Sequence, residues 1–273
     1  MLSQQLANKA SVRVGELARH RFPVVDKDHS VSEALRAMRR NQSDVVLVVE
    51  EGKPLGIFAS EVLLEKLLTE RTRLATVSGL HVSSFVSSNI HTISESETVT
   101  IAAKIMLEKK AISLLVSGDP LRLLSRRDLA RLFVGVTDIT VRDLMSPAIY
   151  IARYGERLVH LRRIMIEKRL DTVPVYGPRG ELVGLISVDD IAWAFVFYHE
   201  ELPERSRKRA RRELRVEDCP LEGPLTVSPE DPASEAAKLL VERGARGVLV
   251  VESSKPVGIL GVDEFVKALA LYA

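Results

Sequence analysis

Hydrophobic residues follow the same order in four successive stretches of this chain: a short apolar segment, a helix-period stretch, two strand-like runs and a second helix-period stretch. In residues 141–191, one helix face is marked by residues three and four positions apart, namely Leu158, Leu161, Ile164 and Met165. The runs TVPVY and ELVGLIS then flank a turn rich in glycine and proline, which is typical of a β-hairpin. The stretch therefore predicts a β-α-β-β-α unit.

The same unit can be aligned along the whole chain. Its strand-like runs read DVVLVVEEGKPLGIFA in the first copy, AISLLVSGDPLRLLS in a shortened second copy and GVLVVESSKPVGILG in the fourth. The repeat is roughly 60 to 75 residues long. Aligning the first helices makes Met38, Met106, Met165 and Leu240 equivalent. The predicted boundaries are residues 1–70, 71–137, 138–200 and 214–273 for the four repeats, with a basic linker at 201–213.

Composition agrees with a folded, water-soluble protein. Hydrophobic residues make up 46% of the 273 positions, enough for a sizeable core. The apolar run at 191–198 is too short to span a bilayer, and the polar start MLSQQLANKA lacks the apolar region of a signal peptide. A single cysteine, Cys219, excludes an internal disulfide and any multi-cysteine zinc site. We therefore expect a cytoplasmic protein without a membrane segment.

Two of the second helices begin with Ser-x-x-Asp, in GLISVDDI (Ser187 and Asp190) and in RLLSRRDL (Ser125 and Asp128). A single such sequence is most simply a capping box, in which the serine accepts a backbone hydrogen bond and the acid lies in the first turn. Its recurrence at equivalent places in two repeats favours an additional binding role. Capping and binding can coexist in the same residues.

The repeat, with VGLISVDDI near its end and DLMSP near its beginning, resembles the CBS domain over roughly residues 12–270. The resemblance implies an α+β fold in which four β-α-β-β-α CBS repeats pair into two Bateman modules, residues 1–137 and 138–273. It also implies that the two modules form a disc, as in the γ subunit of AMP-activated protein kinase.

In the CBS family the hydroxyl at this helix start contacts an adenine nucleotide, and the aspartate accepts hydrogen bonds from both ribose hydroxyls. One carboxylate has two acceptor oxygens and a vicinal diol has two donors, and each bond to a charged acceptor contributes about 1.5–3 kcal/mol. The resemblance therefore implies a site at Gly184, Ser187 and Asp190 and another at Ser125 and Asp128. By the same register the third-repeat site adds Ser146, Ile149, Asp171, Thr172 and Pro174, and the second-repeat site adds Ile90, Ser113 and Leu114.

Repeats 1 and 4 depart from the motif. The first has Ala59 and Val62 in its place, which can neither cap a helix nor hold a ribose, and the fourth has Gly261 and Glu264. We expect one good site in each module, and Glu264 would be the ligand-holding residue of any third site.

Several residues of the two implied sites also have a structural interpretation. Ile149, Ile90 and Leu114 would fit an ordinary core equally well. Arg126 and Arg127 lie beside the second motif and would favour a polyphosphate if they faced the ligand, but arginines in a first helical turn usually point to water.

The expected function is a stand-alone regulatory sensor of adenine nucleotides, with AMP, ADP, ATP or S-adenosylmethionine as the ligand and an unidentified protein as the partner. Binding would have to favour one of two module states. The sequence has no P-loop or G-x-S-x-G motif, and its histidines lack metal-ligand spacing, so we expect neither catalysis nor a metal site. Apolar helix faces in LLEKLL and IAWAFVF would support a homodimer of discs.

The basic segment ELPERSRKRARRELR, residues 201–215, supplies an alternative function: a scaffold that binds nucleic acid or an acidic partner. Acidic residues four positions from basic ones favour instead a solvated connector helix, and no aromatic residue is interleaved for base stacking. The net charge of +2 also argues against a dedicated nucleic-acid binder.

Overall fold

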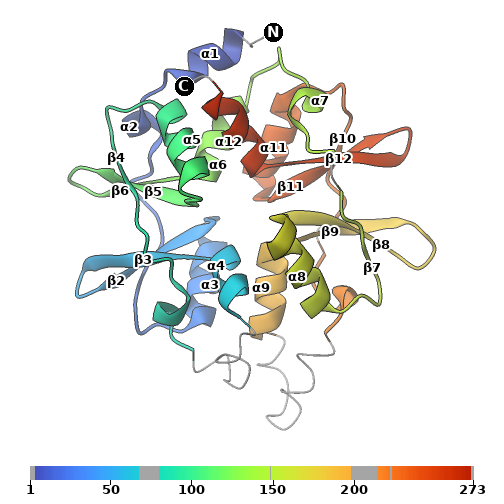
Figure 1. The fold of residues 1–273 in the computed structure, drawn as a ribbon, viewed down its shortest axis with the longest axis horizontal. Helices are drawn as coiled ribbons and strands as arrows, with labels where there is room; N and C mark the ends of the chain where they lie inside the picture. Colours follow the sequence, from blue (N-terminus) through green and yellow to red (C-terminus); the bar gives the residue numbers. More distant parts are fainter. Residues whose placement is uncertain (1–3, 68–79, 148, 198–213, 222, 272–273) are drawn as a thin grey trace. The chain divides into compact units, whose positions relative to one another are not determined.

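The computed structural model describes residues 4–67, 80–147, 149–197, 214–221 and 223–271 (Figure 1). The predicted linker at 201–213 lies outside these residues. The described part consists of helices and four three-stranded sheets, which confirms the predicted α+β class.

Each repeat contains its elements in the predicted order. Repeat 1 comprises α1 (Gln4–Ala10), α2 (Val14–Leu17), β1 (Val24–Asp26), α3 (Val31–Arg40), β2 (Val45–Glu50), β3 (Lys53–Ala59) and α4 (Ser60–Lys66). Repeat 2 comprises η2 (Val82–Phe85), β4 (Thr92–Ser94), α5 (Val99–Glu108), β5 (Ser113–Ser117), β6 (Arg122–Ser125), α6 (Arg126–Ala130) and η3 (Arg131–Phe133). Repeat 3 comprises α7 (Val141–Leu144), β7 (Ala152–Arg153), α8 (Leu158–Lys168), β8 (Thr172–Tyr176), β9 (Leu182–Ser187) and α9 (Val188–Phe197). Repeat 4 comprises η4 (Val216–Asp218), β10 (Thr226–Val227), α11 (Ala233–Arg243), β11 (Gly247–Glu252), β12 (Lys255–Gly261) and α12 (Val262–Ala270).

All four sheets have one topology, in which the first strand runs parallel to the second and the second forms an antiparallel hairpin with the third. In every repeat the register places the first residue of the second strand opposite the residue that precedes the second helix. Directly opposite residues project their side chains from the same face of a sheet. These pairs are Val45–Ala59, Ser113–Ser125, Thr172–Ser187 and Gly247–Gly261.

The first helices α3, α5, α8 and α11 bury the faces that their sequence periodicity predicts. Their aligned residues are all at most 5% exposed, so the predicted equivalence of the four helices is confirmed; these residues are Met38, Met106, Met165 and Leu240.

The segment that opens each repeat, before its first strand, packs against a neighbouring repeat rather than against its own hairpin. In the opening segment of repeat 1, Arg19 N donates to Leu123 O of β6 at 2.8 Å, and Leu123 N donates back to Arg19 O at 3.0 Å. The same reciprocal backbone pairing joins Ser87 to Ile57, and Ser146 to Ile259.

Further single bridges link each opening segment to the start of a first helix in the adjacent repeat. Repeats 1 and 2 therefore exchange their opening segments, and repeats 3 and 4 do the same, which agrees with the predicted pairing of repeats. The bridges are Arg13–Thr98, Ser30–His81, Thr140–Pro232 and Arg157–Arg215.

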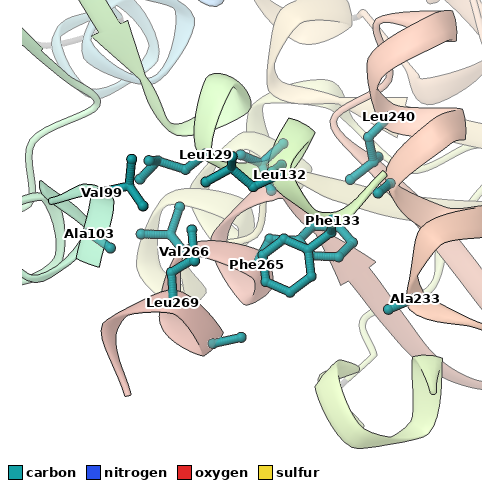
Figure 2. Packing of buried hydrophobic residues seen from close by; sticks show 14 of the residues in the cluster. Val99, Ala103, Leu129, Leu132, Phe133, Ala233, Leu240, Phe265, Val266 and Leu269 are labelled. Carbon is teal, nitrogen blue, oxygen red and sulfur yellow. The ribbon is translucent and has the colours of Figure 1, made fainter. Parts of the chain in front are cut away.

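The chain divides into two compact units, each with its own hydrophobic core. Unit 1 contains residues 1–22, 90–149 and 225–273, and unit 2 contains residues 23–89 and 150–224. Helices of repeats 2 and 4 share the core of unit 1, where the rings of Phe133 and Phe265 lie 4.6 Å apart (Figure 2). Helices of repeats 1 and 3 share the core of unit 2. The predicted boundary at 137 therefore does not separate the compact units.

The apolar faces in LLEKLL and IAWAFVF are used inside unit 2. Leu63, Leu64 and Leu67 are at most 1% exposed, and Ile191 and Phe195 are fully buried in the same core, where α4 packs against α9. The prediction that these residues would be left over for a homodimer is wrong, because contacts between repeats 1 and 3 cover them.

Candidate functional site

The second-repeat motif forms a buried network where β6 meets α6. Ser125 N and Oγ donate to Asp128 Oδ2 at 2.9 and 2.7 Å, and Asp128 N donates to Ser125 Oγ at 3.3 Å. Both residues are fully buried. The capping interpretation is confirmed for this motif, and the cap uses one carboxylate oxygen, Oδ2.

Arg19, from the opening segment of repeat 1, brings a guanidinium into this network. Its Nε donates to Asp128 Oδ2 at 3.0 Å and lies 2.8 Å from Oδ1, and its Nη2 donates to Ser125 Oγ at 2.9 Å. Oδ1 forms ion pairs with Arg19 and, at 3.7 Å, with Arg131. It accepts no aligned hydrogen bond from the described residues. A buried carboxylate needs such compensation because an unpaired charge in the interior is costly.

The third-repeat motif repeats this cap where β9 meets α9. Ser187 N and Oγ donate to Asp190 Oδ2 at 2.8 and 2.6 Å, and Asp190 N donates to Ser187 Oγ at 3.3 Å. Asp190 is half-buried, unlike Asp128. Gly184 lies in β9 opposite Val175. The capping interpretation is confirmed here as well.

A buried hydroxyl without a hydrogen-bond partner lies opposite each motif serine. Ser113 faces Ser125 and Thr172 faces Ser187 across their hairpins. Ser113 and Thr172 are each 5% exposed, and neither side-chain oxygen bonds to any group in the described part of the chain. An unsatisfied buried hydroxyl costs about 1–3 kcal/mol. Each motif therefore has beside it a buried hydroxyl whose hydrogen-bonding capacity the described residues leave unused.

Repeats 1 and 4 lack a hydroxyl at this position as well as the motif; the buried hydroxyl of repeat 1 that has no partner in the described residues, Ser60, lies at the first position of α4 instead. Glu264, in the fourth repeat, accepts from Gly261 N at 3.0 Å and pairs with Lys267, so it serves the start of α12. A ligand role for Glu264 stays a prediction. The residues at the hydroxyl-bearing positions are Val45 and Ala59 in repeat 1 and Gly247 and Gly261 in repeat 4.

Repeats 1 and 4 also have a glycine at the position aligned with Gly184, and there the glycine is needed for packing. A Cβ on Gly56 would lie 2.7 Å from Ser87 O, and one on Gly258 would lie 2.8 Å from Met145 Sδ. These glycines make room for the opening segment of the adjacent repeat, whereas a ligand-facing role for Gly184 stays a prediction.

The four repeats share one topology and exchange their opening segments in pairs. All four match a single family of domains. The match to the CBS domain covers residues 14–69, 82–135, 141–196 and 216–271. The chain belongs to the CBS domain family. Each matched CBS repeat begins with its opening segment and ends within or just beyond its second helix, so the exchanged segments belong to the family unit.

Two curated proteins resemble this CBS chain over nearly its whole length. An uncharacterized 33.4 kDa protein in the ribosomal RNA operon of Thermofilum pendens is 26% identical over 275 residues, which cover 91% of this chain and 89% of that protein. Uncharacterized protein MJ1225 of Methanocaldococcus jannaschii is 23% identical over 284 residues, which cover 95% of this chain and 99% of that protein.

Solved structures share the four-repeat fold. The crystal structure of MJ1225, described as a candidate archaeal homologue of g-AMPK, has a TM-score of 0.79 at 21% identity and covers 94% of this chain and 99% of its own. An uncharacterized conserved protein from Pyrococcus horikoshii has a TM-score of 0.60 at 16% identity, with the same coverage. At these identities the likeness concerns the fold alone.

The remaining residues predicted for the second CBS site fall into two groups. Leu114 is fully buried in the core of unit 1, so its interpretation as a core residue is confirmed. Ile90 is half-buried and lies beside β5, because the carbonyl of the next residue, His91, accepts from Leu115 N at 2.9 Å. Contact between Ile90 and an adenine ring stays a prediction.

The residues predicted for the third site are divided between the units. Asp171 O accepts from Val188 N at 2.9 Å, and Pro174 is buried in β8, so both lie in unit 2 near the motif. Ser146 and Ile149 belong to unit 1, where Ser146 pairs with β12 of repeat 4. Their part in the third-repeat site stays a prediction.

The guanidinium groups of Arg126 and Arg127 bind elsewhere in unit 1. Arg126 Nη1 donates to Asp263 Oδ1 at 2.6 Å. Arg127 is 4% exposed, and its Nη1 donates at 2.8 and 3.1 Å to Leu240 O and Ala245 O, near the C-terminal end of α11. Neither side chain extends into water as expected for a first helical turn, and these contacts do not support the predicted phosphate role.

Sequence reasoning missed Arg19. Alignment of the repeats shows which residues are equivalent to it, namely Ser87, Ser146 and Leu221. It does not show that the opening segment of repeat 1 crosses to repeat 2, and only that crossing brings Arg19 to Asp128.

Cys219 has the properties of a core residue. It is 6% exposed, and burial, with a smaller contribution from the charge of Asp190, raises the pKa of its thiol to about 12. A reactive thiol needs the opposite shift. Within the described ranges, no histidine, cysteine and acidic side chains gather in a metal-binding group, and no helix is long and apolar enough to cross a membrane.

Proposed function

We propose that this protein is a cytoplasmic regulatory module that binds adenosine-containing nucleotides at its second and third CBS repeats and transmits binding to an unidentified protein partner. AMP, ADP and ATP are the leading ligands, and S-adenosylmethionine is a further one. The proposed role is regulatory and needs no catalytic group. The description of MJ1225 as a candidate g-AMPK homologue agrees with this class of function.

The observation that carries the proposal is the pair of buried hydroxyls. Ser113 and Thr172, in the two repeats that have Ser-x-x-Asp, have no hydrogen-bond partner among the described residues, and the equivalent positions of the other repeats carry no hydroxyl. A site used only for capping would have no reason to keep a second, unsatisfied hydroxyl beside the cap. A ligand with several hydrogen-bonding groups would satisfy it.

The carboxylate geometry supports a diol as one part of that ligand. The cap hydrogen bonds in both motifs reach Oδ2, and in Asp128 the other oxygen accepts no aligned hydrogen bond from the described residues. A ribose offers two adjacent hydroxyl donors to such a carboxylate. Each bond to a charged acceptor contributes about 1.5–3 kcal/mol, so loss of one aspartate should weaken its site at least roughly 10- to 100-fold, the value for a single bond.

The test is calorimetric titration of AMP, ADP, ATP and S-adenosylmethionine into the wild type, Asp128→Ala and Asp190→Ala. We expect saturable binding in the wild type and the loss of one site in each variant. The order of affinities would identify the preferred ligand.

A matched control separates ligand binding from helix capping. Asp143 has the same cap geometry, because Thr140 N and Oγ1 donate to its Oδ2 at 2.9 and 2.8 Å, but it lies outside the two motifs. Asp143→Ala should therefore leave nucleotide binding unchanged. The proposal fails if none of the four ligands binds the wild type, or if both motif variants bind as the wild type does.

A further inference from the structure

The two Ser-x-x-Asp sites differ in the residue that the exchanged opening segment brings to them. The segment of repeat 1 delivers Arg19 to Asp128 in repeat 2. In repeat 4 the aligned position of the opening segment is Leu221, a partly buried apolar residue packed against the core of unit 2. At this aligned position the opening segment therefore carries a cation in repeat 1 and an apolar side chain in repeat 4.

The guanidinium of Arg19 has donors left over after it binds the motif. Nε and Nη2 are used by Asp128 and Ser125, whereas Nη1 makes no hydrogen bond to any group in the described part of the chain. The side chain is 20% exposed, so part of it is accessible to solvent. A guanidinium can bind two anions at once because its five N–H groups point along separate edges of a plane.

We propose that Arg19 makes the second-repeat site selective for nucleotides that carry a phosphate, with Nη1 as the phosphate donor and Asp128 Oδ1 as the ribose acceptor. This inference rests on the proposed nucleotide-binding function and deepens it. A neutral nucleoside satisfies the carboxylate but leaves Nη1 unused. The cationic sulfonium of S-adenosylmethionine is repelled by the guanidinium, since like charges destabilise each other.

The test compares AMP, adenosine and S-adenosylmethionine by calorimetry in an Asp190→Ala background, where only the second-repeat site remains. With Arg19 present, AMP should bind at least about 10-fold more tightly than adenosine, as expected for a charge-assisted bond to phosphate. With Arg19→Gln, which keeps a neutral donor near Asp128, that ratio should fall towards one. Arg21→Ala, an exposed arginine two residues away, is the matched control and should keep the wild-type ratio.

Arg19→Lys keeps the positive charge but removes the planar guanidinium. This variant should therefore retain part of the preference for AMP over adenosine. An unchanged ratio of AMP to adenosine affinity in Arg19→Gln would overturn the inference. So would the absence of binding in the Asp190→Ala background while Asp128→Ala still binds, and that result would leave nucleotide binding at the third repeat standing. No binding by the wild type would instead refute the proposed function as a whole.

Discussion

At the scale of single residues, both candidate sites combine a helix cap with a buried hydroxyl that has no hydrogen-bond partner in the described residues. Asp128 and Asp190 are held by their own helix caps, and Ser113 and Thr172 present hydroxyls that have no partner in the described residues. Most buried polar groups in proteins are hydrogen-bonded, so two exceptions at equivalent positions point to a shared cause. A ligand is the cause that we propose.

Thr172→Val tests whether the unpartnered hydroxyl of the third repeat serves a ligand. Removing an unsatisfied hydroxyl should leave the free energy of unfolding of the ligand-free protein unchanged or raise it by up to about 1 kcal/mol, while weakening nucleotide binding. Thr100→Val is the control: Thr100 is equally buried, but its Oγ1 donates to Ala10 O at 2.8 Å, so this change should lower stability by about 1 kcal/mol. Urea denaturation and calorimetry measure both effects. Equal destabilisation by the two variants would contradict the assignment.

At the scale of secondary-structure elements, helix caps hold the repeats in register. Ser30, before α3, forms a capping box with Glu33: Ser30 N donates to Glu33 Oε2 at 2.8 Å, and Glu33 N donates to Ser30 Oγ at 3.2 Å. The same arrangement precedes α6 and α9, where it also forms the candidate sites. Local sequence is sufficient to predict these caps because all of their partners lie within four residues.

The Glu33 cap predicts a loss of stability in acid. Hydrogen bonds from the backbone and then the side chain of Ser30 hold the pKa of Glu33 below its ordinary value of 4.5. The contribution to stability is therefore complete above the pKa of the unfolded chain and is lost as the pH falls through the lower pKa of the folded chain. Urea midpoints between about pH 6 and pH 3 should drop less in Glu33→Gln than in the wild type. Glu51→Gln, at an exposed turn, should behave as the wild type.

At the scale of the whole molecule, the exchange of opening segments decides which parts of the sequence stabilise each other. Leu6 and Val14 lie in the first repeat of the sequence, but they are buried in the core of unit 1 with repeats 2 and 4. Leu63, from the same repeat, belongs to the core of unit 2. A substitution in repeat 1 can therefore act on either core, depending on which side of residue 22 it lies.

Leu6→Ala and Leu63→Ala test this division as a matched pair. Each removes a leucine that is at most 1% exposed and should cost about 2–5 kcal/mol of unfolding free energy. Hydrogen exchange should show lost protection mainly in residues 113–130 for Leu6→Ala and mainly in residues 45–59 for Leu63→Ala. If Leu6→Ala exposed residues 45–59 first, the assignment of α1 to unit 1 would be wrong.

The sequence by itself determined the repeat, its strands and helices, the hairpin turns, the caps and the restriction of Ser-x-x-Asp to two copies. These features depend on contacts within one repeat, where hydrophobic periodicity and turn residues act over a few positions. Only the tertiary structure brought Arg19 to Asp128, directed Arg126 and Arg127 to other elements and buried the faces of α4 and α9 against each other. Each of these outcomes joins residues roughly 100 or more positions apart. No local pattern specifies such a contact, because it follows from which repeat packs against which.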